Sequence, residues 1–390
     1  MHPMRLVALF LFGALWAVAQ APITPKAALE RLFTERPARA EWFAPAFLQQ
    51  VPLAQVEAIL QQLLGGLGRY EGVEPDGPNF RVNFERGVVP AQISLDSEGR
   101  IQGLFFRPPQ PKAALTPEQL LAEYRKLPGE VSVLVLEGPQ ERLSLNADRA
   151  LAVGSSFKLA VLEALRQQIE AGQRRWSDTV PLRPEWKSLP SGTLQNLPDG
   201  TPLSLEQYAT QMISISDNTA TDALISIVGR AEVEKLAPRN RPFLTTREAF
   251  VLKNPQNREW LERYRANPAE RAALLPQLAR LPLPDVSVFA GGPVAIDVEW
   301  FFSTRELCTL MGRVQALPLM SLNPGLANPA DWQRVAYKGG SEPGVLNLTT
   351  WLTAKNGRQY CVSATWNNPQ ARLDENQFFL LYTSLLNSLK

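Results

Sequence analysis

The first hundred residues change from a helical to a strand pattern of apolar positions. Apolar residues recur three and four apart in three segments, which predicts helices at Pro25–Phe33, Glu41–Leu48 and Val56–Leu64, the last ended by Gly65-Gly66. The period then falls to two, which predicts strands at Asn79–Phe84, Ala91–Leu95 and Arg100–Phe106, with a hairpin turn at Asp96–Gly99. Helices followed by an antiparallel meander predict a small α+β domain over residues 22–108.

The rest of the chain predicts a second, larger α+β domain. A proline-rich linker is expected at Arg107–Pro111, and a helix near Thr116–Lys126 follows it. We assign residues 109–129 to this linker and first helix. Strand patterns then occur near both ends of residues 130–390, at Val131–Leu136, Arg142–Leu145, Gly344–Lys355 and Gln359–Trp366, before a last helix at Glu375–Leu389. Between them, Phe157–Leu165 is apolar at nearly every position, which is typical of a buried helix. This order predicts an antiparallel sheet flanked by helices.

The start of the chain has the pattern of a secretory signal. Arg5 precedes the apolar run Leu6–Trp16, and small residues at Ala17–Ala19 and Ala19–Ala21 suit signal cleavage. The run is shorter than the ~20 residues that a membrane-spanning helix needs. We therefore expect residues 1–21 to be a signal peptide, and the mature protein to be periplasmic or secreted without a stable membrane span. A retained membrane anchor is the alternative interpretation.

Composition and charge exclude several kinds of function. The chain has 390 residues and a formal net charge of +2, so no basic surplus favours nucleic acid as a partner. Its only histidine, His2, lies in the expected leader, which excludes a Ser-His-Asp relay in the mature protein. No Asp/Glu cluster has metal-ligand spacing, so we expect no metal and no cofactor. Export would permit a disulfide between Cys308 and Cys361, but two buried free thiols are the expectation.

Three short motifs indicate the chemistry. They are Ser155-Ser-Phe-Lys158, Ser216-Asp-Asn218 and Lys338-Gly-Gly340, and their order and spacing are harder to obtain by chance than any one of them. Ser155 and Lys158 are three apart at a helix start, so both side chains fall on one face and the amine can reach the hydroxyl. Burial and a second cation, for which Lys338 is the candidate, would lower the pKa of Lys158 and make it a base.

Simpler interpretations of the motifs remain possible. Ser155 could only cap a helix, Ser216-Asp-Asn218 could supply the N-cap of the apolar segment after it, and the glycines could form a simple turn. These interpretations explain each motif separately but not the ordered set.

The motifs resemble a known family. The segments Ala152–Lys158, Ile215–Ala220 and Tyr337–Gly340 are similar to those of class A serine β-lactamases and the related penicillin-binding proteins. The resemblance implies that Ser155 is the acylated nucleophile, Lys158 its proton acceptor and Ser216 the relay to the leaving nitrogen. It implies further that Asn218 holds the amide arm of the substrate, that Lys338 attracts its carboxylate, and that the N–H groups of Ser155 and Ser341 form the oxyanion hole. Gly339 and Gly340 let the substrate backbone lie close to the strand-like segment.

Two departures from that family affect the expected chemistry. Gly339 stands where the family usually has Thr or Ser, which removes one hydroxyl contact to the substrate carboxylate, and Ser341 is a candidate substitute. The Glu-x-x-Leu-Asn signature, which supplies the deacylating carboxylate, is missing from Asn240–Phe250. Glu248 is the nearest carboxylate, and we expect it to be a salt-bridged surface residue.

The small first domain and Asn240–Arg247 together are similar to the two-domain β-lactamase-like proteins of the clavulanic acid biosynthesis cluster, in which a steroid-isomerase-like or cystatin-like domain precedes the hydrolase. The sequence therefore predicts an exported serine acyl hydrolase that acts on a small β-lactam, ester or cell-wall peptide and deacylates slowly. A D-Ala-D-Ala peptidase or esterase is one alternative. A protein that binds β-lactams or cell-wall peptides without turnover is another.

Overall fold

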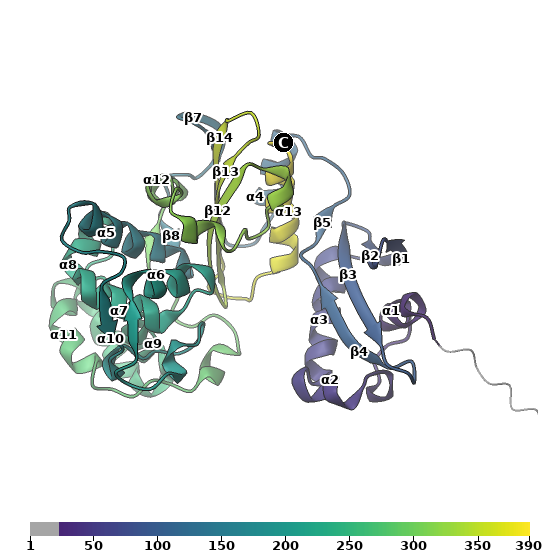
Figure 1. Cartoon of the computed structure of the whole chain (residues 1–390), viewed down its shortest axis with the longest axis horizontal. Helices are drawn as coiled ribbons and strands as arrows, with labels where there is room; N and C mark the ends of the chain where they lie inside the picture. The colour runs from purple at the N-terminus through teal and green to yellow at the C-terminus, as the bar shows by residue number, and fades with distance from the viewer. Residues whose placement is uncertain (1–22) are drawn as a thin grey trace, which may run out of the picture. The chain divides into compact units, whose positions relative to one another are not determined.

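The computed structural model describes residues 23–390, so the expected signal peptide lies outside the described residues. The chain forms two compact units (Figure 1). One contains the described residues up to Leu64 together with Arg69–Glu85 and Val89–Arg107, and the other contains Gly65–Gly68, Arg86–Val88 and Pro108–Lys390. Within residues 23–390, no helix has both the length and the apolar character to cross a membrane.

The first part of the chain contains helices followed by a meander. The helices are α1 (Pro25–Thr34), the 3-10 turn η1 (Ala40–Trp42), α2 (Pro45–Gln50) and α3 (Leu53–Leu67). The strands are β1 (Tyr70–Asp76), β2 (Asn79–Phe84), β3 (Gly87–Leu95) and β4 (Ile101–Phe106), in that order across the sheet, and the short β5 (Gln110–Pro111) pairs with the start of β3. The expected α+β arrangement is present.

Three local expectations for this part were wrong. Helix α3 continues through Gly65-Gly66 because Leu67 is fully buried, and that burial offsets a propensity cost of about 1 kcal/mol for each glycine. The helix expected at Glu41–Leu48 is interrupted, since Pro45 forces the residue before it into an extended conformation. Strand β1 was not expected: only Val73 in it is buried, so it has no clear alternation.

The second unit is built around an antiparallel sheet of five strands. Its order is β12 (Arg334–Glu342), β13 (Val345–Thr353), β14 (Gln359–Asn367), β6 (Glu130–Glu137) and β7 (Gln140–Leu145). Helices α4 (Pro117–Arg125) and α13 (Glu375–Asn387) pack on one face through an apolar cluster, and α12 (Thr304–Val314) packs on the other (Figure 1). The sheet from both ends of the domain is therefore confirmed, with β12 at an edge.

The helical middle forms a second apolar cluster around α5 (Lys158–Glu170), whose first eight residues are all buried. The other helices are α6 (Leu205–Ser214), α7 (Asn218–Val228), α8 (Arg230–Leu236), α9 (Thr246–Lys253), α10 (Arg258–Ala266) and α11 (Arg271–Leu278). Two short strand pairs complete it, β8 (Leu151–Ala152) with β11 (Phe301–Phe302) and β9 (Thr179–Pro181) with β10 (Pro202–Ser204).

The expectation of two free thiols was wrong. Cys308 in α12 and Cys361 in β14 form a disulfide, with their Cα atoms 5.8 Å apart and both side chains buried. The pattern of α12 shows which of its residues are apolar, but not that the helix lies against β14. That packing brings the two sulfurs together.

Candidate active site

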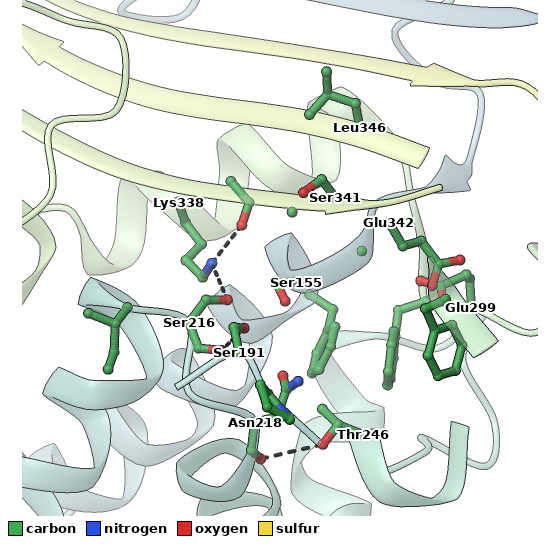
Figure 2. Close-up of a pocket in the computed structure, with 18 of the residues that line it drawn as sticks. Ser155, Ser191, Ser216, Asn218, Thr246, Glu299, Lys338, Ser341, Glu342 and Leu346 are labelled. Carbon is green, nitrogen blue, oxygen red and sulfur yellow. Dashed lines mark hydrogen bonds between the residues drawn. The ribbon is translucent and has the colours of Figure 1, made fainter. Parts of the chain in front are cut away.

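The nucleophile candidate lies in a tight turn in front of the buried helix. Ser155 belongs to the 3-10 turn η2 (Gly154–Phe157), which leads directly into α5 at Lys158. Ser155 lines a pocket of about 580 Å³, and all three motifs contribute to its walls (Figure 2). Lys158 is completely buried behind Ser216 and Asn218. The first motif therefore presents a hydroxyl at the pocket and an amine below it.

The amine of Lys158 is directed at the second motif. Its Nζ donates to the Ser216 carbonyl oxygen at 2.5 Å, to Ser216 Oγ at 3.1 Å and to Asn218 Oδ1 at 2.7 Å. Burial, and after it the charge of Lys338, hold the pKa of Lys158 well below its usual value, against the opposing effect of two aspartates. A neutral amine is therefore accessible at this position, as a general base requires.

The second motif is both a helix cap and part of the site. Asp217 caps α7 by accepting from Ala220 N at 2.8 Å. Its other oxygen accepts the backbone N–H groups of a neighbouring loop, Thr193 at 2.6 Å and Leu194 at 2.9 Å. From the same loop, Ser191 Oγ donates to the Ser216 carbonyl at 2.8 Å. The cap thus fixes Ser216 at the mouth of the helix, where it also lines the pocket.

Ser216 Oγ accepts a hydrogen bond from each of the two lysines, and Figure 2 shows the one from Lys338. Lys338 Nζ donates to Ser216 Oγ at 3.0 Å, and burial lowers the pKa of Lys338 to about 7. A hydroxyl has one hydrogen and two lone pairs. Since Lys158 and Lys338 both donate to this oxygen, the hydrogen of Ser216 is left free to be donated toward a ligand.

Glycines bring β12 against the nucleophile turn. A Cβ on Gly340 would lie 2.3 Å from Ser155 N, and a Cβ on Gly154 would lie 2.9 Å from Ser341 N. Without those side chains the two backbones are in contact, so the N–H groups of Ser155 and Ser341 belong to adjoining segments (Figure 2). As the edge strand, β12 also has one side free to pair with a ligand backbone. An oxyanion hole requires two such backbone donors from adjoining segments.

The departure at Gly339 has a structural explanation. A Cβ at this position would lie 2.1 Å from the hydroxyl oxygen of Tyr337, which also lines the pocket. The tyrosine hydroxyl therefore occupies the space where a threonine side chain would begin. Burial raises the pKa of Tyr337, which keeps this hydroxyl protonated and able to donate. The substitute expected from the sequence was Ser341, and Tyr337 was not predicted.

Glu248 does not reach the pocket. It is the third residue of α9, where it forms a capping box with Thr245, and both its oxygens bind Arg230 at 2.8 and 2.9 Å. The expected salt bridge is present, but the expected surface position was wrong, because the side chain is only 7% exposed. Packing of α9 against α7, which sequence could not show, buries it.

Other pocket residues were missed because they come from separate segments. Ser191 and Thr246 lie near Ser216 and Asn218, and Thr246 Oγ1 donates to the Asn218 carbonyl at 3.4 Å. At the other end are Lys253, Glu299 and Glu342. Glu342 is two residues beyond Gly340 on the same strand, β12, but no strand was predicted there. Within residues 23–390, no group of His, Cys, Asp and Glu side chains is arranged to hold a metal ion.

Residues 116–281 match the sequence model of the β-lactamase enzyme family. No curated protein matches the chain in sequence. Among solved structures, the chain is similar to a β-lactamase from Sphaerobacter thermophilus (20% identity over 69% of this chain and 95% of that one, TM-score 0.49). It is also similar to PBP-A (17%, 73% and 99%, TM-score 0.49) and to a β-lactamase from Chitinophaga pinensis (16%, 70% and 98%, TM-score 0.48). The family match at residues 116–281 supports a β-lactamase-type serine hydrolase.

Proposed function

We propose that the protein is an exported serine acyl hydrolase that opens β-lactams through an acyl-enzyme on Ser155 and releases the product slowly. The observation that carries the proposal is the meeting of two lysines with lowered pKa values at Ser216, beside Ser155 in one pocket. This arrangement provides a base, a nucleophile and a proton donor without histidine.

The hydrogen bonds of Lys158 Nζ go to Ser216 and Asn218, so the proposed acylation requires the amine to turn toward Ser155. Neutral Lys158 takes the proton of Ser155 Oγ as that oxygen attacks the carbonyl carbon, and the N–H groups of Ser155 and Ser341 hold the oxyanion. As the carbon–nitrogen bond breaks, Ser216 gives its hydrogen to the nitrogen. Lys158 lies 3.1 Å from Ser216 Oγ and returns the proton to it. The cycle leaves an ester on Ser155 and both proton carriers in their starting states.

The substrate is held at both sides of its reacting carbonyl. Lys338 and the Tyr337 hydroxyl bind the carboxylate of the substrate, and Asn218 binds its amide arm. Gly339 and Gly340 leave room for the substrate backbone against β12.

Deacylation is the slow step. Glu248, the residue nearest in sequence to the missing glutamate signature, is bound on both oxygens by Arg230 and does not line the pocket. Loss of a general base typically costs about 10²- to 10⁴-fold in rate. A persistent acyl-enzyme is the consequence, as in a penicillin-binding role. A D-Ala-D-Ala peptidase or esterase would use the same acylation apparatus.

The test is mass spectrometry of the protein after incubation with benzylpenicillin, with turnover followed on a chromogenic cephalosporin. We expect an adduct on Ser155 and a burst of about one product per enzyme before slow release. Ser155→Ala should lose both, whereas Ser156→Ala, which removes a buried hydroxyl without a hydrogen-bond partner, should keep both. Turnover retained in Ser155→Ala would disprove the assignment. Absence of both adduct and turnover would favour binding alone.

Export and the role of the first unit complete the proposal. Residues 1–21 act as a signal peptide, and the Cys308–Cys361 disulfide supports passage through an oxidising compartment, periplasmic or extracellular. The first unit is a steroid-isomerase-like or cystatin-like domain of the clavulanic-cluster type, which its helices α1–α3 followed by the β1–β4 sheet support. Fractionation of cells that express the full chain tests export: protein retained in the cytoplasm with its leader intact would contradict it.

A further inference from the structure

One end of the pocket contains three charged side chains that the proposed reaction does not use. Lys253 ends α9, Glu299 precedes β11 and Glu342 ends β12. Lys253 Nζ donates to the two Glu342 oxygens at 2.6 and 2.7 Å and also to Glu299 Oε1. All three residues line the pocket, and the side chains of Lys253 and Glu299 are 1% and 2% exposed. This charged cluster has two carboxylates for one ammonium.

The charged cluster lacks a cation. The three N–H groups of Lys253 are taken by Glu299 Oε1 and the two oxygens of Glu342, and Glu299 Oε2 is buried without a hydrogen-bond partner. A buried carboxylate oxygen without a donor is costly. Burial, followed by the charge of Glu299, raises the pKa of Glu342 to about 8 against the opposing effect of Lys253. Two buried carboxylates therefore share one ammonium, and Glu299 Oε2 remains an acceptor for a second positive group.

Strand β12 relates the charged cluster to the reaction centre. Alternate residues of a strand face the same side, so Lys338, Gly340 and Glu342 share one face. Gly340 is the position that packs against the Ser155 turn. At about 3.3 Å per residue, Lys338 and Glu342 are separated by about 13 Å along the strand. That face therefore has a cation at one end, a bare backbone beside the nucleophile, and a carboxylate at the other end (Figure 2).

The pocket walls near the charged cluster are apolar. Phe250 and Phe289 both line the pocket, with ring centroids 5.2 Å apart. Such walls suit the hydrocarbon part of an acyl arm, and they lower the local polarity in which a charged contact acts.

We propose that Glu299 and Glu342 form a subsite for a primary ammonium group on the acyl arm of the substrate. The preferred acyl donors then carry an anion bound by Lys338, a reacting carbonyl at Ser155 and an ammonium at the charged cluster. The ammonium donates to Glu299 Oε2, and a proton carried by Glu342 is released to water. This inference rests on the proposed function, since it names the substrate class of that site.

The experiment compares two penicillins that differ only in charge, one with a 4-(aminomethyl)phenylacetyl arm and one with the similarly shaped, neutral 4-ethylphenylacetyl arm. We expect the rate constant for acylation of Ser155 to be about tenfold or more higher for the ammonium compound, the size of a charged hydrogen bond. Glu299→Gln and Glu342→Gln should each remove that preference while the neutral compound reacts within about twofold of its original rate. Glu375→Gln, which changes a pocket carboxylate outside the charged cluster, should keep it.

Two results would overturn the subsite. One is equal acylation by both penicillins in the unaltered protein, and the other is a preference that survives both glutamine variants once thermal unfolding shows that they are folded. If neither penicillin acylates Ser155, the proposed function fails separately. The dissociation constants of the two penicillins then decide the subsite: about tenfold tighter binding of the ammonium compound, lost in Glu342→Gln, supports it, and equal binding overturns it.

Discussion

Ser216 is the residue on which the proposed chemistry depends most directly. Its carbonyl accepts from Lys158 and Ser191, and its hydroxyl oxygen accepts from both lysines. The hydroxyl hydrogen of Ser216 is therefore the group that remains available for donation. Its environment therefore makes it a proton donor, whereas Ser155, at the pocket and beside two backbone N–H groups, is placed as a nucleophile.

The pH dependence of acylation follows from the two lysines. Lys338 is cationic below its pKa of about 7 and neutral above it, so attraction of a substrate carboxylate weakens as the pH rises past 7. Lys158, whose pKa is lowered well below the usual lysine value, must be neutral to act as base. We expect the second-order acylation rate constant to fall as the pH rises above about 7.

A stopped-flow pH profile measures this. Lys338→Arg is the matched control, because a guanidinium stays protonated throughout the range, and the fall should disappear in it. An identical fall in the arginine variant would assign it to another group.

Tyr337 supplies a second prediction for the carboxylate end of the substrate. Its hydroxyl occupies the space beside Gly339 where a threonine would begin. Tyr337→Phe should therefore slow acylation by benzylpenicillin about tenfold, since a hydrogen bond to a charged acceptor is lost. The methyl ester of the same penicillin has no carboxylate and should react at nearly the original rate. Equal losses for acid and ester would show that the ring only supports the strand.

Some helices and strands of this fold could be predicted from the sequence pattern, and others could not. Helix α5 and strands β13 and β14 were predicted because their burial is continuous or follows a clear period. Strand β1 and the end of α3 were not predicted, since the strand depends on sheet pairing and the helix end depends on burial of Leu67.

The three motifs of the candidate site could be found because each lies within a few residues. The charged cluster could not, because Glu299 and Glu342 are 46 and 89 residues from Lys253.

Helix α9 provides a prediction at this scale. Glu248→Gln keeps an oxygen for the helix cap but breaks the ion pair with Arg230. Because the Arg230 side chain is 29% exposed, we expect a loss of only about 1–3 kcal/mol in the free energy of unfolding. The slow phase of turnover should not change.

Denaturant unfolding and burst kinetics on the same preparation measure both effects. Glu232→Gln, which breaks an exposed pair with Lys235, should alter neither by a measurable amount. Loss of the slow phase in Glu248→Gln would instead identify it as the deacylating base.

At the scale of the whole domain, the site depends on three separate parts of the chain being packed together. The turn before α5, the start of α7 and the edge strand β12 each supply one motif. Cys308 and Cys361 add a covalent link between α12 and the sheet that contains β12. The packing of the entire second unit therefore maintains the hydrogen-bond distances at Ser216.

The backbone of Ser216 has a consequence for that unit as a whole. Its φ of 60° lies in the left-handed region, where a residue other than glycine costs on the order of 1 kcal/mol or more. Ser216→Gly and Ser216→Ala both lose the hydroxyl, but only glycine relieves the strain. We expect the glycine variant to unfold with about 1 kcal/mol more free energy than the alanine variant, and both to be inactive. Equal unfolding of the two in denaturant titrations would contradict this.

If variants were selected in the laboratory for thermal stability alone, we expect Ser216 to be replaced by glycine and activity to be lost. The reactive serine would survive only while turnover is selected too.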